Sequence, residues 1–239
     1  MASPSHSSVP PLLRPFYEFL FPPACFACGC SLDVREHMVC DRCWSTVRRV
    51  EERDALYRET SGRISAPGVI TDLVAAFYFE KDGVLQTLLH QLKYQGLTRL
   101  GCMLGEHLGK RIMRQLTDLD SASLVPVPLH RAKERERGYN QSVWICKGIS
   151  AVTGLPPETN LLRRVRYTRS QTGLHVVERI KNVGGAFTLH PRGAKDLTGR
   201  TFLLVDDVVT TGSTLEACAM VLAAHGAHKV VACTVALAP

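Results

Sequence analysis

The segment Thr201-Phe-Leu-Leu-Val-Asp-Asp-Val-Val-Thr-Thr-Gly-Ser-Thr214 decides the fold of this 239-residue chain. Residues 201–205 form a continuous apolar run, which is typical of a strand buried on both faces of a parallel sheet. The Thr/Gly/Ser turn leads into a helical pattern at 215–224, and an apolar run predicts a second strand at 229–237. Strand, turn, helix and strand make a βαβ unit, so we expect a ligand at the carboxyl end of the first strand.

The turn combines two adjacent acids with hydroxyl side chains and a glycine. Backbone amides at a helix N-terminus bind phosphate, and Gly212 lets the backbone approach closely. The carboxylates of Asp206 and Asp207 would accept hydrogen bonds from vicinal ribose hydroxyls. The alternative is a plain helix cap beside two solvated acids, but a cap needs one such residue rather than the whole run. The predicted site for a sugar 5-phosphate comprises Asp206, Asp207, Val208, Val209, Thr210, Thr211, Gly212, Ser213 and Thr214.

This loop resembles the signature of type I phosphoribosyltransferases, in which four apolar residues, two acids and two further residues precede Thr-Thr-Gly-Ser-Thr. The resemblance implies that Asp206 and Asp207 hold the ribose hydroxyls of 5-phosphoribosyl-1-pyrophosphate (PRPP). It also implies that residues 210–214 cradle the 5-phosphate. The fold implied is α/β, with a type I phosphoribosyltransferase-like parallel sheet flanked by helices.

Apolar spacing extends this sheet toward the N-terminus. It predicts strands at 73–79 and 124–127 and helical stripes at 84–92 and 97–112. The polar segment 59–68 contains glycine and proline, and it predicts a domain boundary. We therefore expect an N-terminal segment with a zinc module at residues 1–58 and the phosphoribosyltransferase-like domain at residues 69–239.

A basic segment follows the predicted strand at 124–127. Arginine side chains bind phosphate oxygens bidentately, so this loop suits a pyrophosphate leaving group. We predict catalytic roles for Arg131, Arg135 and Arg137, with Lys133 in the same run. Mg²⁺ is expected to arrive with the pyrophosphate that it neutralises. A solvated charge run on a surface helix is the alternative interpretation.

A second basic run, Arg163, Arg164, Arg166 and Arg169, precedes a polar segment with paired glycines near residue 185. The segment is typical of a mobile loop that closes over a charged ligand. The same arginines, with Tyr167, would also suit contacts to a nucleic acid. The sequence leaves both interpretations open.

Four cysteines form two pairs near the N-terminus. Cys25-x2-Cys28 and Cys40-x2-Cys43 predict a tetrahedral zinc site with no open position, and therefore a structural site. Cys30 is an alternative ligand and His37 a weaker one. Disulfides are disfavoured in a chain without an export signal. The remaining cysteines, Cys102, Cys146, Cys218 and Cys233, lie in apolar segments and are expected in the core.

The composition is that of an ordinary globular protein, with 45% hydrophobic and 21% charged residues. The formal charge of +7 suits phosphate-bearing ligands or nucleic acid. No apolar stretch is as long as the span of about 18 residues that a bilayer requires. Prolines and charges interrupt residues 1–23. We expect a soluble, cytoplasmic protein without membrane insertion.

Further motifs along the chain are Cys25-x-x-Cys28, Leu92-Lys93-Tyr94-Gln95-Gly96, Pro126-Val-Pro-Leu-His-Arg131, Arg137-Gly-Tyr-Asn-Gln141, Gln171-Thr-Gly-Leu174, Arg179-x-x-Asn182-Val183 and the terminal loop. Together these motifs resemble the ComF/GntX family. The resemblance runs from about Leu20 to Leu237 and implies a link to competence, the uptake of DNA for natural transformation. We therefore predict PRPP binding and phosphoribosyl transfer to an acceptor that the sequence does not identify. The alternatives are a non-catalytic, PRPP-responsive protein that binds single-stranded DNA and, with less support, an interaction scaffold.

Overall fold

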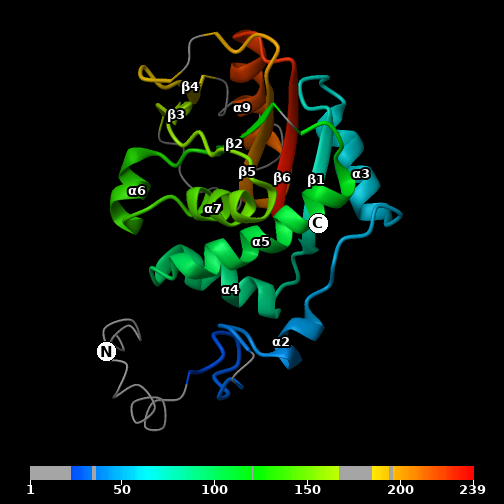
Figure 1. Cartoon of the computed structure of the whole chain (residues 1–239), viewed down its shortest axis with the longest axis vertical. Helices are drawn as coiled ribbons and strands as arrows, with labels where there is room; N and C mark the ends of the chain where they lie inside the picture. The colour runs from blue at the N-terminus through cyan, green and yellow to red at the C-terminus, as the bar shows by residue number, and fades with distance from the viewer. Residues whose placement is uncertain (1–22, 34–35, 120, 167–184, 194–195) are drawn as a thin grey trace. The chain divides into compact units, whose positions relative to one another are not determined.

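The computed structural model describes residues 23–33, 36–119, 121–166, 185–193 and 196–239 (Figure 1). The chain divides into two compact units, Met1–Val47 and Arg48–Pro239. The sequence placed this division between residues 58 and 69, where the structure has most of helix α3 (Ala55–Ser65). Tyr57 and Ile64 of α3 belong to the buried core of the larger unit, which explains why the segment is part of it.

The smaller unit contains one short helix, α2 (Asp41–Thr46), among its described residues. Its loops are joined by two isolated antiparallel bridges, Ala24 with Ser31 and His37 with Val39. The backbone amide of Cys25 donates to the carbonyl of Cys30 at 2.7 Å, which closes a tight turn around the first cysteine pair.

The larger unit is built on a four-stranded sheet in the order β1 (Asp72–Tyr78), β6 (Lys229–Leu237), β5 (Thr201–Val209) and β2 (Ala122–Pro126). All three neighbouring pairs are parallel. The predicted α/β class is confirmed. Strand β5 continues beyond Val205 because Asp206, Val208 and Val209 remain in register with β6.

Side chains along the strands point alternately to the two faces of the sheet, and each face packs against a different layer. One face packs with α3, with α9 (Ser213–Ala224) and with the antiparallel hairpin β3 (Leu162–Arg164) and β4 (Phe187–Leu189). The other face packs with α5 (Thr98–Gln115) and α7 (Gln141–Thr153), and α4 (Val84–Tyr94) leads into α5 (Figure 1). The sheet is therefore covered on both sides, as its apolar strands require.

Helices α5 and α7 approach one another at backbone distance. A Cβ at Gly105 would lie 2.2 Å from the Ile145 carbonyl oxygen, and one at Gly148 would lie 1.9 Å from that of Cys102. Only glycine fits at these positions. The contact fixes α7 against α5, and the start of α7 is part of the candidate site.

The basic segment after β2 is a helix, α6 (Arg131–Arg137), and not a loop as the sequence suggested. His130 caps its start through its ring Nδ1, and Gly138, at φ +84°, ends it in the left-handed conformation. In the second basic run, Arg163 and Arg164 lie in β3 and Arg166 is exposed. Residues 167–184, with Arg169, Tyr167 and most of the predicted closing loop, lie outside the described residues. None of the helices in the described part combines the length and apolarity that a bilayer span requires.

Candidate functional site

The site lies where β2 and β5 end side by side. Pro126 is in register with Val205, and the Val127 amide donates to the Val205 carbonyl at 2.9 Å. The chain leaves β2 toward α6 and leaves β5 through the phosphate turn, which we define as residues 210–214. Parallel pairing therefore brings the basic helix and the turn to one edge of the sheet.

Asp206 and Asp207, the acid pair, are fixed by local hydrogen bonds. The Asp207 amide donates to Asp206 Oδ1 at 2.9 Å, and the Val208 amide donates to Asp207 Oδ1 at 2.8 Å. Ser142, at the start of α7, donates its hydroxyl to Asp206 Oδ1 at 3.4 Å. Only 7% of the Asp207 side chain is exposed. Both acids are thus structured before any ligand binds.

Lys93 is the partner of the acid pair that the sequence did not assign. Its Nζ lies 2.7 Å from Asp207 Oδ2, and 27% of its side chain is exposed. Burial opposes its charge, but the adjacent Asp207 carboxylate raises the pKa of Lys93 above its ordinary value. The Leu92-Lys93-Tyr94-Gln95-Gly96 motif was the available signal, although a plain helix C-terminus explained it equally well.

The pKa of Asp206 differs from that of an exposed carboxylate. Burial, followed by the neighbouring Asp207 carboxylate, raises the pKa of Asp206 to about 7. A carboxyl group with this pKa is only partly ionised near neutral pH. Acids with perturbed pKa values are often found at functional sites.

Further cations face the same edge. Burial, with the nearby charges of Arg137 and Arg164, lowers the pKa of Lys133, and Lys93 contributes to the same effect. Lys133 and Arg137 are four residues apart, so they share one face of α6. Arg131 and Arg135 are exposed. The cation group, as we call it, consists of Lys93, Lys133, Arg137 and Arg164.

The motif Arg137-Gly-Tyr-Asn-Gln141 holds this arrangement together. Gln141 accepts a hydrogen bond from Arg137, and the Tyr139 hydroxyl donates to the Leu92 carbonyl next to Lys93. Asn140 caps α7 through the Ser142 amide and donates to the Val127 carbonyl at 2.9 Å. The side chains of this motif therefore connect α4, α6 and α7 through hydrogen bonds next to the site.

The phosphate turn precedes α9, whose N-cap is Gly212 at φ +81°. The Thr211 and Ser213 hydroxyl oxygens lie 3.1 Å apart, at the start of the helix. Val209 is buried in the core, so only its backbone is available to a ligand. The turn therefore has the local geometry of an anion site at a helix N-terminus.

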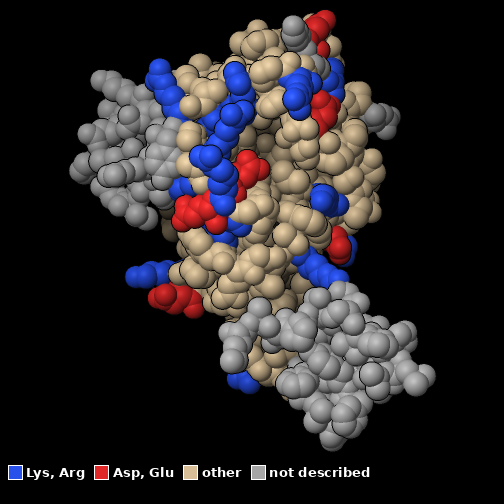
Figure 2. Space-filling model, turned by 90° about the vertical axis from the view of Figure 1, so that its left-hand side faces the viewer, with Lys and Arg blue, Asp and Glu red and all other residues tan. Residues whose placement is uncertain are grey.

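Figure 2 shows Lys and Arg side chains gathered in a column on the side of the molecule that carries α6 and the β3–β4 hairpin. Acidic side chains lie among them, and the adjoining surface is hollowed. This charge distribution suits a polyanionic ligand.

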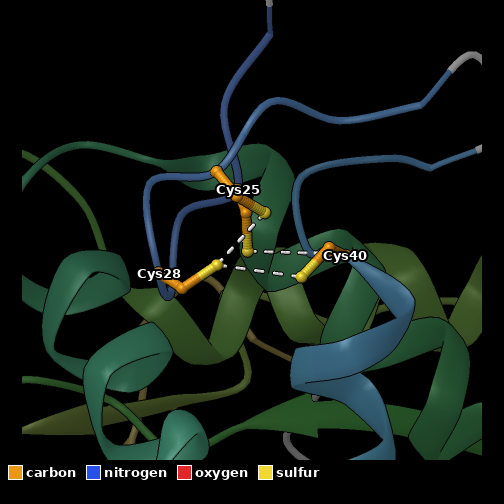
Figure 3. A group of neighbouring side chains, drawn as sticks. Cys25, Cys28 and Cys40 are labelled. Carbon is orange, nitrogen blue, oxygen red and sulfur yellow. Dashed lines mark hydrogen bonds between the residues drawn. The ribbon is translucent and has the colours of Figure 1, made fainter.

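The smaller unit contains a separate cluster of thiols. The Sγ atoms of Cys25, Cys28, Cys30 and Cys40 all lie within 4.8 Å of one another. In a tetrahedral zinc site, with Zn–S bonds of about 2.3 Å, sulfur atoms are about 3.8 Å apart. The Sγ atoms of Cys28 and Cys40 are 3.8 Å apart and point toward one another (Figure 3). The donor set therefore fits structural zinc.

The fourth ligand differs between the geometry and the sequence pattern. Cys30, rather than Cys43, completes the tight group, and its Sγ lies 3.2 Å from that of Cys28. The Cys30 backbone amide lowers the pKa of Cys28 to about 6. Cys43 is buried beside the group, and its thiol interacts with those of Cys40, Cys28 and Cys25. His37 is not part of the group.

Single serine substitutions distinguish the two ligand sets. We expect Cys30→Ser to lower the zinc content of the purified protein, because it removes one of four ligands, whereas Cys43→Ser retains about one zinc per chain. Zinc is measured by elemental mass spectrometry, with Cys102→Ser on α5 as the matched control. Loss of zinc from Cys43→Ser with retention in Cys30→Ser would instead establish the set predicted from the sequence.

Two solved structures are similar to this chain at low identity and low TM-score. One is titled "Structure of the allosteric regulatory enzyme of purine biosynthesis", with 20% identity, a TM-score of 0.35, and coverage of 56% of this chain and 26% of that one. The other is the L. donovani hypoxanthine-guanine phosphoribosyl transferase, with 14% identity, a TM-score of 0.34, and coverage of 57% and 71%.

Sequence relatives are more informative. Competence protein F of Haemophilus influenzae is 27% identical over 207 residues, which cover 84% of this chain and 86% of that protein. DNA utilization protein YhgH of Salmonella typhimurium is 33% identical over 149 residues, which cover 61% of this chain and 64% of that protein. The sequence profile of the phosphoribosyl transferase domain matches residues 106–239, more than half of the chain. The chain therefore belongs to the phosphoribosyl transferase domain family and is a ComF-family protein.

Proposed function

We propose that this protein binds PRPP with Mg²⁺ and transfers the phosphoribosyl group to an acceptor, releasing pyrophosphate. The observation that carries the proposal is the meeting of the acid pair, the phosphate turn and the cation group at one edge of the sheet. These three features match the three parts of PRPP: a vicinal diol, a 5-phosphate and a pyrophosphate.

Each part of the site has one task. The acid pair accepts hydrogen bonds from the ribose hydroxyls, and the phosphate turn donates amides and hydroxyls to the 5-phosphate. Lys93, Lys133 and Arg137 stabilise the charge that develops on the leaving pyrophosphate. Arg131 and Arg135, predicted from the sequence as catalytic, are exposed on α6. Their positive charge would attract the anionic ligand toward the site by electrostatic steering. Mg²⁺ comes with the substrate and neutralises pyrophosphate oxygens.

The reaction then proceeds by positioning and electrostatics. The bond between ribose C1 and the pyrophosphate oxygen breaks, and the pyrophosphate leaves with the electron pair. A lone pair of the acceptor forms the new bond to C1, and the acceptor's proton passes to water. Fixed cations and fixed diol acceptors lower the barrier because they require no reorganisation during the reaction.

The direct test is PRPP binding and turnover by the purified chain. We expect saturable PRPP binding in calorimetry with Mg²⁺ present, and pyrophosphate release when a nucleobase or amine from a panel of acceptors is the substrate. Absence of PRPP binding at millimolar concentration would refute the proposal. Binding without pyrophosphate release from any acceptor would favour the non-catalytic alternative.

That alternative is a protein that binds single-stranded DNA under the control of PRPP. The names of the relatives, competence protein F and DNA utilization protein, together with the exposed Arg131, Arg135 and Arg166, favour it. Phosphate contacts make DNA affinity fall steeply with salt. A filter-binding titration with single-stranded DNA, with and without PRPP, tests this function. Lack of binding at low salt would exclude it.

A further inference from the structure

Helix α3 contacts the phosphate turn from a part of the chain that lies before the profile match at residues 106–239. The Arg63 guanidinium donates from Nη2 to the Thr210 carbonyl at 2.9 Å. Ile64, the next residue, is 3% exposed and lies against Gly212, where an added Cβ would be 2.6 Å from Ile64 Cγ1. The last turn of α3 therefore packs against both the first and the third residue of the phosphate turn.

This contact changes the electrostatics of the turn. A carbonyl oxygen within a phosphate-binding turn carries partial negative charge and repels the ligand. Arg63 places a positive charge on the Thr210 carbonyl. A guanidinium has five N–H donors, and Arg63 is exposed. The exposed guanidinium thus adds positive charge beside the first residue of the phosphate turn.

Arg63 and the cation group come from different elements and contact different parts of the site. Lys93 contacts the acid pair, and Lys133 and Arg137 come from α6. Arg63 comes from α3 and contacts the turn that follows the acids. The two sets of cations therefore lie at different parts of the site: the cation group lies at the acid pair and α6, and Arg63 lies at the phosphate turn.

We propose that Arg63 is a positioning and specificity residue for the 5-phosphate: it holds the Thr210 carbonyl and supplies positive charge that makes the turn select a phosphorylated sugar. The inference rests on the proposed function, since it assigns the phosphate turn to the 5-phosphate. It predicts an effect confined to ligands that carry this phosphate.

The test compares three ligands that differ in whether they carry the 5-phosphate, the pyrophosphate or both. Arg63→Ala is expected to weaken binding of ribose 5-phosphate and of PRPP about tenfold, the scale of one charge-assisted hydrogen bond. Inorganic pyrophosphate with Mg²⁺ should bind within about twofold of the unaltered protein, because its cations remain in place. Arg63→Lys keeps the charge and should recover most of the lost affinity. Calorimetry on the full chain gives all three affinities.

Arg58→Ala is the matched control. Arg58 is exposed on the same helix, five residues earlier and therefore roughly 140° around the axis, so its removal should leave all three affinities unchanged. Equal ribose 5-phosphate binding by Arg63→Ala and the unaltered protein would overturn the inference. A parallel loss of pyrophosphate affinity would also overturn it, because that pattern indicates general damage to the site. If the unaltered protein bound neither PRPP nor ribose 5-phosphate, the proposed function itself would fall.

Discussion

Replacing both members of the acid pair by asparagine, Asp206→Asn with Asp207→Asn, is expected to weaken PRPP binding by at least about a hundredfold. Each carboxylate would accept a charge-assisted hydrogen bond from a ribose hydroxyl, and such a bond contributes about 1.5–3 kcal/mol. Two of them correspond to a factor of about one hundred or more in affinity. The amide keeps the size of the carboxylate but loses its charge, so the effect reports on recognition rather than on shape.

The Asp206→Asn substitution by itself should not unfold the protein, and the pKa of Asp206 provides the reason. Its pKa is raised from 3.8 to about 7, so the folded state holds more protons than the unfolded state between these values. Stability from this group is full below about pH 4 and is lost as the pH rises through about 7. Asp206→Asn removes that loss, so the single variant should be more stable than the unaltered protein at pH 8. At pH 4 the difference should disappear.

Calorimetric titration with PRPP and Mg²⁺ measures the binding loss, and urea unfolding at pH 4 and pH 8 measures the stability. Glu106→Gln, which changes an exposed acid on α5, is the control for a loss of one negative charge. Unchanged PRPP affinity in the double variant would remove the acid pair from the site. A loss of stability in Asp206→Asn at pH 8 would show that the raised pKa does not describe the folded protein.

The fold was predictable where the spacing of apolar residues in the sequence matches the residues that the structure buries. Strand β6 and helix α9 match their predicted ranges closely, because continuous apolar runs and a glycine-rich turn mark them in the sequence. Residues 59–68 were predicted to contain a domain boundary, because glycine, proline and several charged residues hide the helix α3 and its buried positions Tyr57 and Ile64. Its helical state is set by packing against the sheet, and tertiary contacts of this kind override local propensity.

The candidate site likewise has parts that the sequence predicted and parts that it did not. The acid pair and the phosphate turn are contiguous in the chain, so a local motif was sufficient to predict them. The pairing of Lys93 with Asp207 joins distant segments, and no local pattern specifies it. In the basic helix α6, the spacing separates the face of Lys133 and Arg137 from that of Arg131 and Arg135, but the sequence does not say which face turns inward. The same limit applies to Cys30 and Cys43, since both lie within reach of the first cysteine pair.

The second large effect is expected at Lys93. Lys93→Met leaves Asp207, whose side chain is 7% exposed, without the ammonium 2.7 Å away. Breaking a fully buried pair costs about 3–5 kcal/mol, and the 27% exposure of the Lys93 side chain reduces this. We expect the free energy of unfolding at pH 7 to fall by about 2–3 kcal/mol. Urea unfolding measures it, and Lys110→Met, an exposed lysine on α5, is the control.

A double-mutant cycle separates the pair from the packing of the lysine chain. Methionine keeps much of the apolar stem of lysine, so the loss should come from the uncompensated carboxylate. Asp207→Asn removes that charge, and the variant with both substitutions should regain at least about 1 kcal/mol over Lys93→Met alone. If Asp207→Asn returned no stability to Lys93→Met, the ion pair would not be what holds α4 at the acid pair. The Tyr139 contact to the Leu92 carbonyl would then be the attachment that matters, and Tyr139→Phe would reproduce the loss.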